Sequence, residues 1–213
     1  MNFPTLNGQY TISSLIAEIH EISKKRSLYI LAIDGRGGSG KSTLAARIQA
    51  ECPGSVAVHM DDFYFPSSDR VQLPPSQKPI GADYDWERVC NQILKPLTKG
   101  KEARYQRYDW ETDIMAEWHE VPAGGLVIIE GTYSIRKELA GYHDFTIWVE
   151  CPRDQRLKRG LERDGEDARQ MWEDNWMVHE DLYVGVQRPQ ERANLVVDER
   201  AESEDILIVR VYL

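Results

Sequence analysis

The stretch GRGGSGKS, residues 35–42, decides the fold class of this chain of 213 residues. It matches the pattern G-x-x-x-x-G-K-[ST], in which a glycine-rich loop between a strand and a helix turns its amide groups toward a phosphate. The apolar run at residues 28–33 predicts the strand, and residues 43–50 predict the helix, whose dipole adds positive potential. The sequence therefore predicts a phosphate-binding loop. An ordinary glycine-rich turn is the weaker alternative.

The parts of this loop have separate expected roles. Lys41 is expected to reach the β- and γ-phosphates of ATP as a mobile positive charge, and Ser42 to offer its hydroxyl to Mg²⁺, which prefers oxygen ligands. The expected cofactors are therefore ATP, as phosphoryl donor, and Mg²⁺. The residues expected to bind the nucleotide are Gly35, Gly37, Gly38, Ser39, Gly40, Lys41, Ser42 and Thr43.

Outward from the loop, short apolar runs alternate with segments of helical periodicity. Further strands are predicted at 55–59, 126–129, 145–149, 194–197 and 206–212, and helices at 11–26, 85–94, 153–163 and 166–183. This alternation predicts an α/β, three-layer fold with a mostly parallel central sheet, and together with the loop at 35–42 it predicts a P-loop NTP hydrolase fold. Residues 102–121, rich in aromatics, predict a small hairpin insertion. We expect one domain over residues 1–213.

Acidic residues follow two of the predicted strands. Asp61 and Asp62 come after the strand at 55–59, and Glu130 ends the strand at 126–129. The carboxyl ends of strands are where open α/β sheets bind ligands, so these acids are candidates for a catalytic base and for magnesium binding. Helix or turn capping is the structural alternative for each of them.

Taken together, the motifs resemble the uridine kinase and phosphoribulokinase family of P-loop kinases. The resemblance spans most of the chain: the loop, DDFY at 61–64, YDW at 108–110, EG at 130–131, and the segments 156–164 and 193–197. It implies that Asp61 is the catalytic base and that Glu130 supports magnesium together with Ser42. Asp62 would then be a secondary metal-supporting residue.

The resemblance also implies an acceptor site and a lid. The implied substrate-binding residues are Tyr64, Asp83 or Asp85, Tyr108 and Trp110, with the choice between the two aspartates left open. The lid, at about residues 163–184, would close Arg163 and Arg169 over the phosphates and make them catalytic with Lys41 and Asp61.

Two positions depart from the family pattern. The family usually has a histidine a few residues after the YDW stretch, whereas this chain has Asp113 there and its histidine comes later, at His119. In the lid, Trp172 and Trp176 stand where the family is commonly more polar and basic, and we interpret them as packing anchors rather than as rings that stack on a substrate.

The composition favours small-molecule partners. A formal net charge of −9 argues against binding nucleic acid or an anionic membrane, and no apolar run approaches the length of a membrane span. The three cysteines have no CxxC spacing and suggest neither disulfides nor zinc, so a cytoplasmic location is expected. A homo-oligomer remains open.

The sequence thus predicts an ATP-dependent phosphotransferase that acts on a hydroxyl of a small molecule, with a nucleoside such as uridine or cytidine as the preferred acceptor. A kinase of the same family for pantothenate, a sugar or a sugar phosphate is the first alternative. A P-loop regulatory ATPase is the second. The chain has no N-K-x-D stretch, which weighs against a GTPase.

Overall fold

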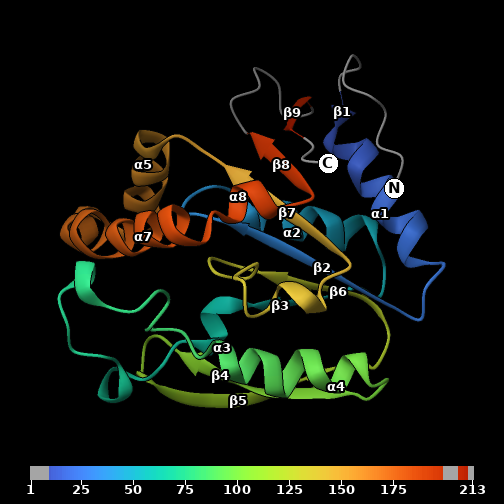
Figure 1. Ribbon diagram of the computed structural model, residues 1–213, viewed down its shortest axis with the longest axis horizontal. Helices are drawn as coiled ribbons and strands as arrows, with labels where there is room; N and C mark the ends of the chain where they lie inside the picture. Colours follow the sequence, from blue (N-terminus) through green and yellow to red (C-terminus); the bar gives the residue numbers. More distant parts are fainter. Residues whose placement is uncertain (1–9, 199–205, 211–213) are drawn as a thin grey trace.

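A mixed β-sheet forms the centre of the molecule (Figure 1). The computed structural model describes residues 10–198 and 206–210, and within them the sheet has the strand order β1-β9-β8-β7-β2-β6-β3. From β8 to β3 the strands pair in parallel, whereas β9 pairs antiparallel with β8 and β1. The strands are β1 Tyr10–Thr11, β2 Leu28–Gly35, β3 Val56–His59, β6 Gly125–Glu130, β7 Phe145–Glu150, β8 Leu195–Asp198 and β9 Ile206–Arg210.

The strands predicted from the short apolar runs are therefore confirmed. The predicted last strand included residues 211 and 212, which lie outside the described residues. β2 occupies a central position because it is apolar on both faces. Its side chains alternate: Leu31 and Ile33 enter one core cluster, whereas Ile30 and Ala32 enter the other.

One face of the sheet is covered by α1, Ile12–Ser23, and α2, Lys41–Glu51. Thr11 begins α1, and its hydroxyl accepts a hydrogen bond from the amide of Ser14 at 3.1 Å. The apolar residues that recur at helical spacing in the sequence are the ones that the two helices bury against the sheet. The buried residues are Leu15, Ile16 and Ile19 of α1 and Leu44, Ala45 and Ile48 of α2.

The opposite face is covered by a helical segment that changes type along its length. It starts as α3, Trp86–Arg88, continues as a π-helical stretch at Val89–Leu94 and ends as α4, Lys95–Thr98. The sequence predicted a single helix ending near residue 94. The widened turn lies just before Pro96, which has no amide hydrogen to continue the regular helical pattern.

The remaining helices extend this layer and one end of the sheet. They are α5 Arg153–Asp164, α6 Arg169–Met171, α7 Met177–Gln187 and α8 Pro189–Arg192, with a π-helical stretch at Trp172–Trp176 between α6 and α7. With α1 and α2 on the other face, these elements complete the predicted three-layer α/β architecture. None of the described helices is both long and apolar enough to cross a bilayer.

A hairpin lies outside the central sheet. Its strands β4, Ala103–Asp109, and β5, Ile114–Val121, pair only with each other among the described residues and form a second, antiparallel sheet beside α4 (Figure 1). The hairpin predicted at 102–121 is confirmed. Its turn brings Trp110 to the same side of the molecule as the carboxyl ends of the parallel strands.

Candidate active site

The phosphate-binding loop joins the end of β2 to the start of α2, as the sequence predicts. Its backbone needs glycine at position 38, where φ is +75° and an added Cβ would lie 2.5 Å from the carbonyl oxygen of Arg156. Lys41 is 7% exposed, and its Nζ donates to the carbonyl oxygen of Arg36 at 3.1 Å. The loop is thus a compact turn with a nearly buried ammonium group on its inner side.

A cavity of about 790 Å³ opens from this loop. Its walls come from the loop, the ends of β3 and β6, the segment before α3, the hairpin turn, α5 and the lid. The sequence-predicted site residues that line it are Gly37, Gly38, Gly40, Lys41, Ser42, Thr43, Asp61, Tyr64, Asp83, Trp110, Glu130 and Arg163. Those that do not line it are Gly35, Ser39, Asp62, Asp85, Tyr108 and Arg169.

Glu130 and Ser42 form a pair of oxygen groups beside Lys41. The Ser42 hydroxyl donates to Glu130 Oε1 at 3.0 Å, and His59 Nδ1 lies 2.8 Å from Glu130 Oε2. Burial raises the pKa of Glu130, but the His59 contact, the Lys41 charge and the Ser42 hydrogen bond outweigh it and leave that pKa lowered. Glu130 is therefore ionised at neutral pH, and His59 orients it. His59 was not among the residues predicted to form the site.

Asp61 faces the same cavity from the turn after β3. Burial among protein atoms and the charge of Glu130 raise its pKa, whereas Lys41, the Tyr84 hydrogen bond and Arg163 lower it. Its Oδ1 accepts from the Tyr84 hydroxyl at 3.2 Å. The carboxylate thus faces the open cavity. Its pKa depends on the charges of Glu130 and Lys41 and on the hydrogen bond from Tyr84.

Asp62, the next residue, turns the other way. Its Oδ2 accepts from the Tyr105 hydroxyl at 2.8 Å, and its carbonyl oxygen accepts from Arg88 at 3.0 Å. These contacts lie against the hairpin and α3 rather than toward Ser42 and Glu130. The structure does not bring Asp62 to the predicted metal-binding pair, because consecutive residues of a helical turn point in different directions.

Aromatic rings form another part of the cavity wall. Tyr64 is 5% exposed, and its ring centroid lies 4.4 Å from that of Trp110 and 4.6 Å from that of Tyr84. Trp110, by contrast, is 45% exposed on the hairpin turn. The wall therefore has a fixed part beneath and a solvent-facing indole above, an arrangement that suits a flat or ring-shaped molecule.

Asp83 and Asp85 occupy different places in the structure. Asp83 lines the cavity, and Lys78 Nζ contacts its two carboxylate oxygens at 2.9 and 3.0 Å. Asp85 instead caps α3 by accepting from the amide of Arg88 at 2.9 Å. Of these two residues, Asp83 lines the cavity and Asp85 does not. His179, which was not among the predicted site residues, lines the cavity from α7 and lies 3.9 Å from Asp83.

Tyr108 supports the aromatic wall from behind. It is 2% exposed, its hydroxyl donates to Asp113 at 2.7 Å, and Arg70 donates to the same hydroxyl at 2.6 Å. Its ring lies 5.2 Å from that of Trp110. The structure therefore places Tyr108 beneath the cavity surface and not on it. Asp113 is already engaged by Tyr108 on the hairpin and by Ser67 and Arg70 of the loop before α3.

The lid arginines occupy different environments. Arg163 lines the cavity, and its guanidinium carbon lies 5.7 Å from the Trp172 ring centroid, beside Asp164. Arg169 does not line the cavity, because it pairs with Glu166 at 2.9 Å and with Glu173 at 3.7 Å on the outer surface. Arg159, which was not predicted individually, lines the cavity from α5.

The lid tryptophans both line the cavity but differ in how deeply they are buried. Trp172 is 2% exposed and packs with Leu161 and Met177, in agreement with its interpretation as a packing anchor. Trp176 is only partly buried and lines the cavity. Both belong to the π-helical stretch before α7.

A fully buried carboxylate beneath the site holds three of its segments together. Asp34, at the end of β2, accepts hydrogen bonds from the amides of Gly35, Tyr133 and Ile135 and from the hydroxyl of Tyr183. Burial raises its pKa to about 6 despite these donors. Tyr133 has a φ of +74°, an uncommon value for a non-glycine residue, and Asp34 stabilises that turn.

A phosphate-binding loop at the carboxyl edge of a parallel sheet, with a carboxylate and a hydroxyl–carboxylate pair facing one cavity, defines a P-loop nucleotide-binding enzyme. The sequence model of the Phosphoribulokinase / Uridine kinase family matches residues 81–206. The chain belongs to this family. It is therefore a kinase, and membership of a kinase family implies a nucleotide as phosphoryl donor.

Individual relatives agree with this assignment. A uridine kinase of Ureaplasma parvum is 27% identical over 158 residues, which cover 70% of this chain and 74% of that protein. The structure of a possible uridine kinase from Bacillus stearothermophilus superposes with a TM-score of 0.69 at 24% identity, covering 87% of this chain and 96% of the other. A D-glycerate 3-kinase from Cryptococcus neoformans has the same fold, with a TM-score of 0.54 at 16% identity over 94% of this chain and 96% of the other.

Proposed function

We propose that this kinase transfers the γ-phosphoryl group of ATP to a hydroxyl group of a nucleoside such as uridine or cytidine. The observation that carries the proposal is that Asp61 and Lys41 face one cavity, which the aromatic pair Tyr64 and Trp110 also lines. A phosphate donor and a ring-bearing acceptor can therefore meet at a carboxylate. The curated relatives named uridine kinase support the nucleoside as acceptor.

In this proposal Asp61 acts as the general base. The acceptor hydroxyl oxygen attacks the γ-phosphorus, the bond to the β–γ bridging oxygen breaks, ADP leaves, and the hydroxyl proton passes to Asp61. Lys41 and Arg163 stabilise the negative charge on the transferred group, together with the amides of the loop. Arg169 would join them only after a movement that releases it from Glu166 and Glu173.

The oxygen atoms of Ser42 and Glu130 fit a magnesium ion. They are 3.0 Å apart, both residues line the cavity, and Glu130 is ionised. Ser42 would hold Mg²⁺ directly, and Glu130 would hold it directly or through a water molecule. The ion would supply charge neutralisation to the β- and γ-phosphates. Asp62 would act only by supporting the turn that carries Asp61.

The acceptor would lie against Tyr64 and Trp110, with Asp83 as the polar contact for its hydroxyl groups. Tyr108 would contribute by fixing the position of Trp110. Asp85 would contribute by starting α3, because its carboxylate is used as a helix cap.

One observation favours a second acceptor class within the same family. The hairpin carries Asp113 where the family usually has a histidine, and Asp113 already contacts Tyr108 and Arg70. No imidazole is therefore offered to a pyrimidine from that position of the hairpin. An acceptor without a base, such as a sugar, a sugar phosphate or pantothenate, is the alternative.

The test is ADP release by the purified protein with ATP and Mg²⁺ across nucleosides, pantothenate, sugars and sugar phosphates. We expect little ADP without acceptor and strong stimulation by uridine or cytidine. Stimulation by another compound alone would replace the nucleoside as acceptor. ADP release that no acceptor increases would instead show a regulatory ATPase and contradict the kinase mechanism.

A further inference from the structure

A buried carboxylate of α7 reaches into the phosphate-binding loop. Glu180 Oε1 accepts a hydrogen bond from the amide of Gly37 at 2.7 Å, and the side chain lines the cavity beside the loop. Glu180 is 6% exposed. Because the amides of this loop are the groups that bind nucleotide phosphates in P-loop enzymes, the carboxylate occupies a donor that a phosphate oxygen would otherwise use.

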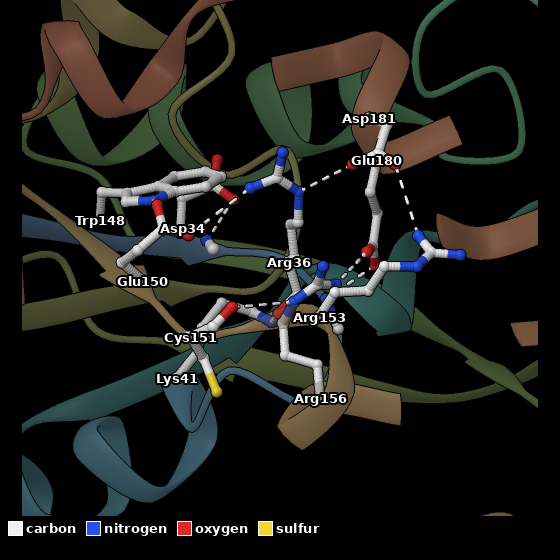
Figure 2. A network of polar contacts seen from close by, with 12 residues as sticks. Asp34, Arg36, Lys41, Trp148, Glu150, Cys151, Arg153, Arg156, Glu180 and Asp181 are labelled. Carbon is white, nitrogen blue, oxygen red and sulfur yellow. Dashed lines mark hydrogen bonds and ion pairs between the residues drawn. The ribbon is translucent and has the colours of Figure 1, made fainter. Parts of the chain in front are cut away.

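The surrounding structure holds Glu180 in this position. Arg156 of α5 donates to Glu180 Oε2 at 3.2 Å and to the carbonyl oxygen of Cys151 at 3.1 Å (Figure 2). At Gly37 an added Cβ would lie 2.8 Å from Glu180 Oε1 and 3.0 Å from the Trp172 ring. The loop backbone therefore lies directly against Glu180 and Trp172, with no room for a side chain between them.

Glu180 lies among several positive groups of the loop and of α5. Burial raises the pKa of Glu180, while the Gly37 amide, Lys41, Arg156 and Arg36 lower it, and the first effect is the larger. Lys41 is the cation that a nucleotide needs, so a carboxylate near it competes for the same positive charge. The interaction between close charges is strong in such a buried setting, because little water screens it.

We propose that Glu180 is an internal competitor of the nucleotide phosphates, which occupies the Gly37 amide and lowers the affinity of the loop for phosphate. It is thus a residue of the nucleotide site that sets how tightly substrate and product are held, and weaker binding of ADP favours its release after transfer. This inference rests on the proposed function, because it takes nucleotide phosphates as the ligands of the loop.

The neighbouring acid provides a matched control. Asp181 is on the same helix, and its carboxylate contacts the side chains of Arg36 at 3.2 Å and Arg153 at 3.5 Å. Its side chain is 53% exposed, and its contacts are with side chains rather than with the loop amide. Removing its charge changes the net charge as much as removing that of Glu180, but leaves the Gly37 contact in place.

The experiment measures the dissociation constants of inorganic tripolyphosphate and of ADP by calorimetry. Glu180→Gln removes the charge while keeping the shape, and we expect both ligands to bind about tenfold more tightly. Glu180→Asp keeps the charge and the partner of Arg156 but withdraws the carboxylate from Gly37, and we expect binding about threefold tighter. Asp181→Asn should change either constant by less than about twofold.

A residue that only stabilised the loop would give the opposite sign, since its loss would weaken binding. Unchanged or weaker binding in Glu180→Asp, with a native melting temperature, would overturn the inference even if Glu180→Gln failed to fold. Lys41→Ala separates the two proposals. If the wild type binds tripolyphosphate and Lys41→Ala does not, the proposed nucleotide site is supported. The Glu180 variants then test the proposed role of Glu180. If the wild type binds neither ligand, the nucleotide site and this inference fail together.

Discussion

The two ends of the cavity are built in different ways. The phosphate end is mostly backbone from one continuous segment, residues 35–43, and its side chains Lys41 and Ser42 are fixed by the start of α2. The acceptor end is made of side chains from separate segments, with Tyr64 after β3, Asp83 before α3 and Trp110 on the hairpin. A site made of backbone amides suits one kind of ligand group, here a phosphate. A site assembled from side chains of several segments changes its shape and polarity when any one segment is substituted.

The largest expected effect tests the phosphate end. Lys41→Ala removes the cation that reaches the β- and γ-phosphates, so we expect kcat/KM to fall about 10⁴-fold. The dissociation constant of ATP should rise as well, which equilibrium binding would measure. An enzyme that keeps near-normal ATP affinity and turnover would show that the nucleotide lies elsewhere.

The next effect lies at the boundary between the two ends. Asp61→Asn removes the proposed base but keeps the size of the side chain, so kcat should fall about 10³-fold. ATP affinity should change by less than about threefold, because the loop is untouched. Initial rates and ATP titrations on the same preparation check both statements, and full activity would remove Asp61 from the base role.

A smaller effect should be confined to the acceptor end. Trp110→Ala removes the exposed ring that packs on Tyr64, so the KM of the acceptor should rise about tenfold while the KM of ATP stays constant. Trp118→Ala is the matched control, because Trp118 is on the same hairpin, is 48% exposed and does not line the cavity. Equal effects of the two substitutions would mean that Trp110 acts through hairpin stability.

The smallest effect concerns proton affinity. The Tyr84 hydroxyl lowers the pKa of Asp61, so Tyr84→Phe should raise that pKa. Because the base must be ionised, the acidic limb of kcat/KM against pH should move to higher pH. Activity should drop about two- to threefold on that limb and remain nearly constant on the plateau. A limb displaced to lower pH would contradict the Asp61–Tyr84 contact as the cause.

The contrast between one continuous segment and several distant segments also explains what the sequence alone could predict. The loop, Asp61 and Glu130 follow directly from short motifs at strand ends, and the three-layer fold follows from the alternation of apolar runs and helical segments. Glu180 could not be found this way, because it lies 143 residues after its partner Gly37. Asp34 adjoins the loop, yet its partner Tyr133 is 99 residues away.

The direction in which a side chain points was the second feature that the sequence could not predict. Asp61 and Asp62 are neighbours in sequence, and only the geometry of the turn shows that one faces the cavity and the other faces Tyr105. Likewise Asp83 and Asp85 differ by two positions, and the start of α3 decides that the second is a helix cap. Such choices depend on tertiary packing and leave no periodic signal in the sequence.

The separate hairpin sheet has an evolutionary consequence. Because β4 and β5 share no strand pairing with the central sheet in the described part of the chain, substitutions there leave the parallel strand registers untouched. Selection can therefore exchange the indole at the hairpin turn, or lengthen the turn that carries it, while the phosphate-transfer machinery stays the same. On the proposed assignment of Trp110 to the acceptor site, a lineage can acquire a new acceptor by remodelling this one peripheral hairpin.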